Sequence, residues 1–278
     1  MNSGGGMRAF EAVTEAITSI SEDKKLWRYP VAASGIASAL LAISGLDSNV
    51  ESVAYTPRFG IGIAILLALM ALLIRLTVIY YPTRAFYYHK KGIPFEESAL
   101  IRESLRGGIL ALLVGIVYGI VILVVGGLML FPAILAYYAL PGTTKYVVAG
   151  VLGLPPAIFL MGIITMMIPA YIWSQDFGEG LGIIGTALDN AKEVFVFGAL
   201  MGAIIVGIWA AAGGLVFLTS LVARGFIGAL LAGLLDGLIT GISSVFSDVA
   251  GVVMYRKLKI WVEKERPVEI DPDWLTSL

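Results

Sequence analysis

Long apolar runs separated by short polar stretches dominate the chain. A helix needs about 20 consecutive apolar residues to cross the hydrocarbon core of a bilayer, and six runs reach or approach this length. They predict membrane-crossing helices at residues 29–46, 59–82, 107–131, 146–173, 194–222 and 226–255. The pattern therefore predicts an all-α fold, a polytopic membrane bundle of about six transmembrane helices. Pro155 and Pro156 predict a kink or break in the fourth run.

A different pattern precedes the first run. Apolar residues recur every three or four positions, which forms one stripe on a helix: Met7, Phe10, Val13, Ile17 and Ile20. We expect an amphipathic helix within residues 1–28, whose stripe either packs on the bundle or contacts lipid. The chain then divides into this segment, a membrane domain at 29–255 and a tail at 256–278.

Lysine and arginine are distributed unequally between the two sides of these spans. The N-terminal segment, the connections at 83–106 and 174–193, and the tail carry fifteen of them, against three on the opposite side. Cytoplasmic connections carry the excess of Lys and Arg in membrane proteins. We therefore expect a multi-pass protein of the plasma membrane with both termini in the cytoplasm.

The two long connections on the basic side resemble each other. In the first, Pro82 precedes the amphipathic stretch "FEESALIRESLRGG"; in the second, Pro169 precedes "LGIIGTALDNAKEVFVFG". Each unit reads as a span, a cytoplasmic amphipathic segment and another span. The two units enter from the same side, so a parallel internal duplication is one hypothesis and chance similarity among apolar helices is the other.

The stretches "AITSISEDKKLWRYPV", "PTRAFYYHKKGIPFEESALIRESLRGG" and "IPAYIWSQDFGEGLGIIGTALDNAKEVFVFG" together suggest a family. Over about residues 10–215 the chain resembles a six-span prokaryotic superfamily. It includes the membrane domain associated with glycerophosphoryl diester phosphodiesterases, along with uncharacterised archaeal relatives. The resemblance implies only a membrane-domain role, because the soluble phosphodiesterase domain with its acidic metal ligands is not found in this sequence.

The last span carries the main candidate site. Five polar residues share one face at positions i, i+4, i+7, i+11 and i+12: Asp236, Thr240, Ser243, Ser247 and Asp248. Small residues at four-residue spacing overlap that face and allow another helix to approach: Gly233, Gly237 and Gly241. Ionisable residues within spans are costly and are functional candidates by default.

Arg75, inside the second span, is the candidate partner for Asp248, because each lies seven residues from the basic end of its predicted helix. An ion pair between them would hold two helices in register, or would form a gate or headgroup site; Arg75 could instead reach the headgroups. Asp236 lies about 18 Å deeper than Asp248. It is either a packed, hydrogen-bonded carboxyl or a residue of a proton or cation pathway.

Two further sets of residues have simpler interpretations. Small-xxx-small pairs predict helix contacts in the third and fifth spans: Gly115 with Gly119, and Gly198 with Gly202. Four cations at 83–106 either face anionic headgroups or reflect topology alone: Lys90, Lys91, Arg102 and Arg106.

Composition removes several classes of function. The chain has no cysteine and one histidine, which argues against a metal site, a disulfide or a thiol nucleophile. Its net charge of −1 gives no polycation for nucleic acid. We find no catalytic motif and predict neither an enzyme nor a cofactor. The absent cysteine and the few amide side chains favour a heat-adapted source.

Three functions remain as hypotheses. The first is a non-enzymatic scaffold or membrane subunit that meets a lipid, a protein partner or another copy of itself. The second is a small ion- or proton-coupled transporter with Asp236 in its pathway. The third is a membrane component of a macromolecular translocation machine.

Overall fold

The computed structural model describes residues 6–45 and 60–265 of the chain. Within these ranges the chain is helical and contains no strand, which confirms the all-α prediction. The elements in chain order are α1 (Met7–Glu22), the 3₁₀ turn η1 (Lys24–Leu26), α2 (Arg28–Ser44), α3 (Ile61–Lys91), α4 (Glu97–Ala139), α5 (Thr144–Ser174), α6 (Phe177–Asp189), α7 (Ala191–Val222) and α8 (Gly225–Glu265).

Six of the described helices are long and apolar enough to cross a membrane: α2 with η1, α3, α4, α5, α7 and α8. Their outer surfaces carry large apolar side chains, among them Leu123 (74% exposed) and Val206 (68% exposed). Such extensive apolar exposure is rare on a soluble monomer and suits contact with lipid. The protein is therefore a multi-pass helical membrane protein.

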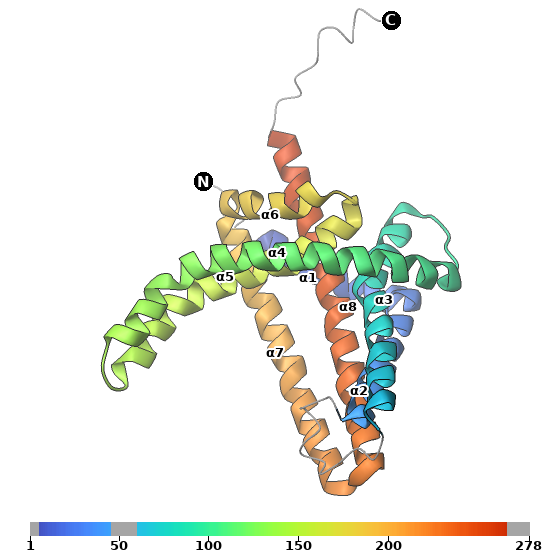
Figure 1. Ribbon diagram of the computed structural model, residues 1–278. Coiled ribbons are helices and arrows are strands. Elements are labelled where there is room, and N and C mark those ends of the chain that lie inside the picture. The colour runs from blue at the N-terminus through green and yellow to red at the C-terminus, as the bar shows by residue number, and fades with distance from the viewer. Residues whose placement is uncertain (1–5, 46–59, 266–278) are drawn as a thin grey trace, which may run out of the picture.

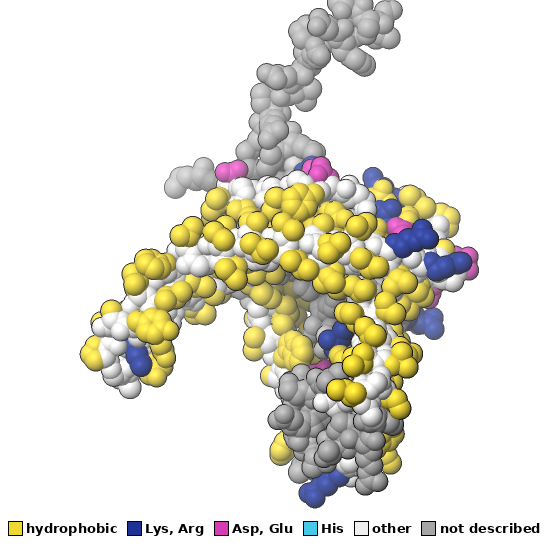
Figure 2. Space-filling model, in the orientation of Figure 1, with side chains coloured by type: hydrophobic (Ala, Val, Ile, Leu, Met, Phe, Trp, Pro, Cys, Tyr) yellow, Lys and Arg dark blue, Asp and Glu magenta, His cyan; other side chains and the backbone are white. Residues whose placement is uncertain are grey.

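The six helices do not form one parallel bundle. In Figure 1, α2, α3, α7 and α8 run along a common direction, while α4 and α5 form a curved hairpin that leaves them at a steep angle. Only 17% of the most apolar stretch of α4 is buried, and Figure 2 shows apolar side chains along this hairpin. At about 1.5 Å per residue, the 43 residues of α4 extend for roughly 64 Å.

Several helix boundaries differ from the sequence prediction. Helix α3 continues through Pro82 to Lys91, and α4 begins at Glu97 rather than at 107 and passes through Pro132. The amphipathic stretch expected at 83–106 is thus the end of one long helix and the beginning of the next, and only the second connection forms a separate helix, α6. Internal prolines are tolerated in membrane helices because neighbouring groups satisfy the freed backbone carbonyl.

Helix α1 uses small residues to contact the bundle. Its buried face consists of Ala9, Ala12, Val13 and Ala16, together with Ser19. Larger members of the predicted stripe lie elsewhere: Met7, Phe10 and Ile17 are 54–61% exposed. The two interpretations of the stripe therefore apply to different residues, since Val13 and Ile20 pack on the bundle while Met7, Phe10 and Ile17 are largely exposed.

Glycines allow α8 to pack closely on α2. A Cβ added at Gly233 would lie 2.7 Å from the Cβ of Ala42, and one added at Gly241 would lie 2.7 Å from the Cα of Val31. At Gly237 it would collide with the Ser34 carbonyl oxygen. All three predicted glycines of α8 therefore lie at one helix contact, where the two backbones approach each other.

The other predicted glycine pairs divide differently. Gly198 of α7 lies against α5, close to Gly162, whereas Gly202 and Gly119 have no atom within 4 Å of an added Cβ. Gly115 would meet only the Ile168 side chain. Gly119 and Gly202 are thus not at a described helix contact, because four-residue spacing does not say which face of a uniformly apolar helix turns inward.

Candidate functional site: a basic pocket at the terminal face

One end of the molecule, here called the terminal face, combines α1, the last turns of α3, helix α6 and residues 255–259 of α8. Ion pairs hold α1 to this face. Glu15 lies 2.9 Å from Lys90 of α3 and 3.4 Å from Lys257 of α8, and Lys257 also lies 3.2 Å from Glu11. Asp23, which follows α1, lies 3.0 Å from Nδ1 of His89. These contacts fix α1 across the ends of two membrane helices.

A basic pocket opens at the terminal face with a volume of about 520 Å³. Three helices contribute its lining through residues near their C-terminal ends: Lys90, Lys91, Trp173, Ser174, Tyr255, Arg256 and Lys259. Residues far apart in sequence meet here because α3, α5 and α8 all approach this face at their C-terminal ends. Four of the seven lining residues are cations, so an anion is the ligand that this pocket suits by charge.

Two of these four cations are already paired. Lys90 pairs with Glu15, and the ammonium of Lys259 contacts the Glu179 carboxylate, which also accepts a hydrogen bond of 2.7 Å from the Tyr255 hydroxyl. The hydrogen bonds from Lys259 and Tyr255 lower the pKa of Glu179, so the carboxylate is ionised. Among the described residues, Lys91 and Arg256 have no acidic partner, which leaves the pocket with excess positive charge.

Trp173, one of the residues that line the basic pocket, contacts both a cation and a second aromatic ring. The Arg256 guanidinium lies 4.9 Å from the centre of the Trp173 ring, and the Tyr87 ring packs edge-on against Trp173 at 5.0 Å. Stacking on an aromatic face limits the motion of a guanidinium while its N–H groups remain free to donate. Such a group can bind a phosphoryl or carboxyl oxygen in two-pronged fashion.

Only half of the predicted headgroup residues reach this pocket. Lys90 and Lys91 line it, whereas Arg102 and Arg106 are exposed on the first turns of α4, and the Nε of Arg102 donates to the Ser98 carbonyl in its own helix at 3.4 Å. Sequence reasoning missed Arg256 and Lys259, which it counted as tail residues. Their three-residue spacing places them on one face of a helix, but the extent of α8 was not evident.

The structure places the polar residues of α8 in different surroundings. Asp236, Thr240 and Ser247 are half-buried, whereas Ser243 is buried and its hydroxyl has no hydrogen-bond partner among the described residues. Asp248 is partly buried and lies 3.5 Å from the hydroxyl of Ser244, which donates to it. The stripe therefore does not form one continuous hydrogen-bonded cluster among the described residues.

Arg75 and Asp248 are not brought together. Arg75 of α3 donates instead to the hydroxyl of Ser38 on α2 at 3.2 Å. Gly233 packs beside this same part of α2, since its added Cβ would lie 2.9 Å from the Ser38 carbonyl oxygen. Ser38, and with it Arg75, therefore lies beside Gly233, which is about 15 residues from Asp248 along α8. Equal counting from the predicted helix ends could not show this, because both α3 and α8 continue beyond those ends and their packing sets which residues lie at one level.

Comparison of the chain with protein-family models, with curated proteins and with solved structures found no match.

Proposed function

We propose that this protein is a membrane scaffold or membrane subunit that holds an anionic phospholipid headgroup in the basic pocket. The observation that carries the proposal is the pair Lys91 and Arg256, two cations without an acidic partner in the described structure. They stand beside Trp173, an aromatic residue of the kind that concentrates at membrane–water interfaces. A basic pocket between membrane helices at that level matches the chemistry of anionic lipid headgroups.

The distribution of cations also bears on where the protein lies in the cell. We place it in the plasma membrane with the terminal face toward the cytoplasm, because the excess of Lys and Arg flanks the spans on that side. Anionic lipids are enriched in the cytoplasmic leaflet, where each nearby cation adds about 1 kcal/mol of attraction. A membrane-domain role is also what the resemblance to the six-span superfamily implies.

The test is a lipid titration of the purified protein in mild detergent, followed by native mass spectrometry. Dioleoyl phosphatidylglycerol carries one negative charge, and dioleoyl phosphatidylcholine carries none overall. The double variant Lys91→Gln, Arg256→Gln should bind the anionic lipid roughly 25-fold more weakly, the equivalent of about 2 kcal/mol. Its affinity for the zwitterionic lipid should be unchanged.

The matched control is Arg102→Gln, Arg106→Gln, which removes the same charge from α4 outside the basic pocket. It should leave the affinity for phosphatidylglycerol unchanged. Equal losses in both double variants would mean a general effect of charge and would overturn the proposal. Displacement of the lipid by millimolar inorganic phosphate would identify free phosphate, not a headgroup, as the ligand.

A second candidate function, transport, has one observation in its favour. Asp236 and Asp248 are carboxyl groups within a helix that is apolar and long enough to cross a membrane. Intramembrane carboxyls commonly serve proton or cation pathways. Transport through α8 requires water to reach Asp236, so a membrane-impermeant thiol reagent should label Asp236→Cys in sealed membranes if the protein is a transporter.

A further inference from the structure

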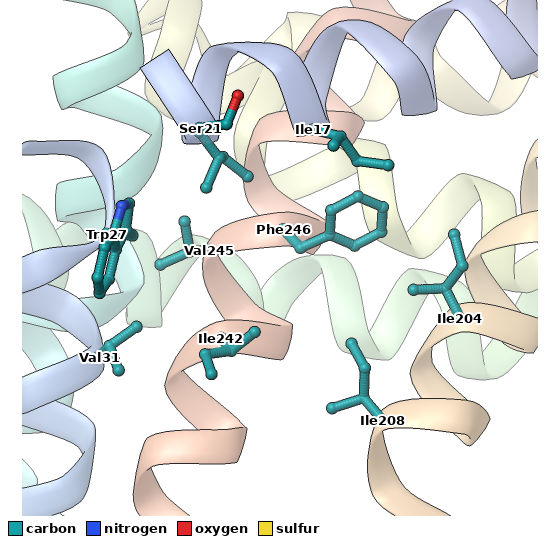
Figure 3. Close-up of a pocket in the computed structure, with 10 residues that line it drawn as sticks. Ile17, Ser21, Trp27, Val31, Ile204, Ile208, Ile242, Val245 and Phe246 are labelled. Atoms are coloured by element: carbon teal, nitrogen blue, oxygen red, sulfur yellow. The ribbon is translucent and has the colours of Figure 1, made fainter. Parts of the chain in front are cut away.

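A second cavity, here called the apolar groove, lies beneath α1 and has a volume of about 540 Å³. Residues of α1, α2, α7 and α8 line it together with Trp27, which precedes α2: Ile17, Ile20, Ser21, Trp27, Val31, Ile204, Ile208, Ile242, Val245 and Phe246. Figure 3 shows Ile204 and Ile208 on one side of the space, Trp27 and Val31 on the other, and Ile17 and Ser21 above it. The volume lies within the range of about 300–1,000 Å³ that is typical of ligand sites.

The lining of the apolar groove excludes a polar ligand. Eight of its ten residues have purely hydrocarbon side chains. The Ser21 hydroxyl already donates to the Thr18 carbonyl at 2.7 Å, which leaves the Trp27 indole as the remaining polar group. Three of the four lining helices are apolar and long enough to cross a membrane. Hydrocarbon from the bilayer is therefore the chemistry that fits this space, since an empty groove would forfeit its dispersion contacts.

Two cations close to Trp27 in the sequence favour an anionic lipid as the ligand of the apolar groove. Lys24 lies three positions before Trp27 and Arg28 directly follows it. Both are exposed, and neither forms an ion pair with a described residue. Arg28 precedes Val31 by three positions, so the two share a side of α2. The apolar groove thus has a hydrocarbon lining and two exposed cations within three positions of its lining residue Trp27, and a phospholipid has the complementary arrangement of an apolar chain and a phosphate.

We propose that the apolar groove binds one acyl chain of an anionic phospholipid whose phosphate lies beside Lys24 and Arg28. This site shares no residue with the basic pocket, and it does not depend on the function proposed for that pocket. The apolar groove would hold the lipid mainly through its acyl chain, whereas the basic pocket would hold it through the headgroup. Helix α1, anchored by its ion pairs, closes the groove at the terminal face.

The test is to fill the apolar groove with a bulky side chain and to measure lipid binding. It uses the full chain with Lys91→Gln and Arg256→Gln as background, so that the basic pocket does not contribute. Ile208→Trp places a bulky ring in the groove from α7. Val206→Trp is the matched control on the same helix, at a position that is 68% exposed and outside the groove. Native mass spectrometry then measures binding of dioleoyl phosphatidylglycerol.

We expect Ile208→Trp to weaken the binding of one lipid by about tenfold or more and Val206→Trp to leave it unchanged. Ile242→Trp, at a groove position that is 48% exposed, should have the same effect through α8. If Ile208→Trp does not fold, the result for Ile242→Trp decides the test. The double variant Lys24→Gln, Arg28→Gln should weaken the binding of phosphatidylglycerol but not that of phosphatidylcholine.

A second measurement does not depend on filling the groove. In a variant that keeps Trp27 as its single tryptophan, a phospholipid with brominated chains should quench the indole fluorescence, and the quenching should persist after excess lipid is removed. Unchanged lipid binding in both Trp variants, or quenching that disappears with the excess lipid, would overturn the proposal. A dimer that dissociates in Ile208→Trp would instead assign the groove to a second copy of the chain.

Discussion

The carboxylate of Glu193 accepts a hydrogen bond of 2.9 Å from the backbone N–H of Gly6, although 187 positions separate the two residues. Glu193 lies in the first turn of α7, and Gly6 immediately precedes α1. The same side chain accepts a second bond of 3.3 Å from the N–H of Ala9. The first N–H groups of a helix have no partner within the helix, so a buried carboxylate from α7 satisfies the start of α1.

Loss of this cap should release α1. Glu193→Ala should lower the free energy of unfolding by about 1–2 kcal/mol, because a buried negative charge at a helix N-terminus and its hydrogen bonds are removed. Hydrogen exchange should accelerate most at the amides of α1. Glu22→Ala, at the exposed far end of the same helix, is the control. Equal exchange in the two variants would contradict the capping role.

The ion pairs of the terminal face predict a loss of stability in acid. Hydrogen bonds from Lys259 and Tyr255 lower the pKa of Glu179 below its ordinary value of 4.5. For Glu15, burial alone would raise the pKa, but Lys90 and Lys257 outweigh it and the pKa is also lowered. The stability from both groups is therefore present in full above pH 4.5 and disappears as the pH falls through their lowered values.

Thermal unfolding measured across the acidic range checks this expectation. The melting temperature should fall between neutral pH and pH values below 4.5. Glu179→Gln should flatten the dependence, because the amide carries no proton-linked charge, whereas Glu22→Gln should not. A steeper fall in Glu179→Gln than in the unchanged protein would show that the sign is wrong.

Two glycine substitutions compare a helix contact with an open position. Gly237→Ala should destabilise by about 1–3 kcal/mol, because its methyl group would collide with the Ser34 carbonyl oxygen of α2 and force α8 away. Gly202→Ala, with no atom within 4 Å, should be neutral or stabilising, since alanine favours a helix over glycine. Unfolding in detergent measures both. Similar losses would mean that α2 and α8 are not in contact there.

The partners of Arg75 can be tested by double-mutant cycles on stability. Arg75→Gln combined with Ser38→Ala should show a coupling energy of about 0.5 kcal/mol or more, because the hydrogen bond joins the two side chains. Arg75→Gln combined with Asp248→Asn should be additive within about 0.5 kcal/mol. Strong coupling in the second cycle would restore the ion pair that the sequence suggested.

Whether water reaches Asp236 distinguishes the proposed scaffold function from the proposed transport function. The chain has no cysteine, so Asp236→Cys provides a single thiol without further changes. In sealed membranes we expect no reaction with a membrane-impermeant thiol reagent from either side, and full reaction after denaturation. Labelling from one side before denaturation would mean that water reaches this part of α8, and it would favour transport over the scaffold.

Much of the architecture followed from the sequence alone. Apolar runs of roughly 18–30 residues predict helices that can cross a membrane, because backbone groups in lipid must be satisfied within the segment. The glycines of α8 were identified by spacing, and all three lie against α2. Lys90 and Lys91 were identified by their charge beside a span. Each of these inferences uses only neighbours along one helix.

The tertiary structure decided which faces meet. A helix that is apolar all round has no periodic signal, so its sequence does not reveal that Gly198 lies against α5 while Gly202 is open. Nor could local pattern show that α4 and α5 leave the other helices, that Glu193 caps α1, or that Arg256 joins Lys91 in one pocket. Segments determine their own secondary structure by short-range spacing. Contacts between residues more than a hundred positions apart depend on the rotation and crossing of whole helices, which no single segment contains.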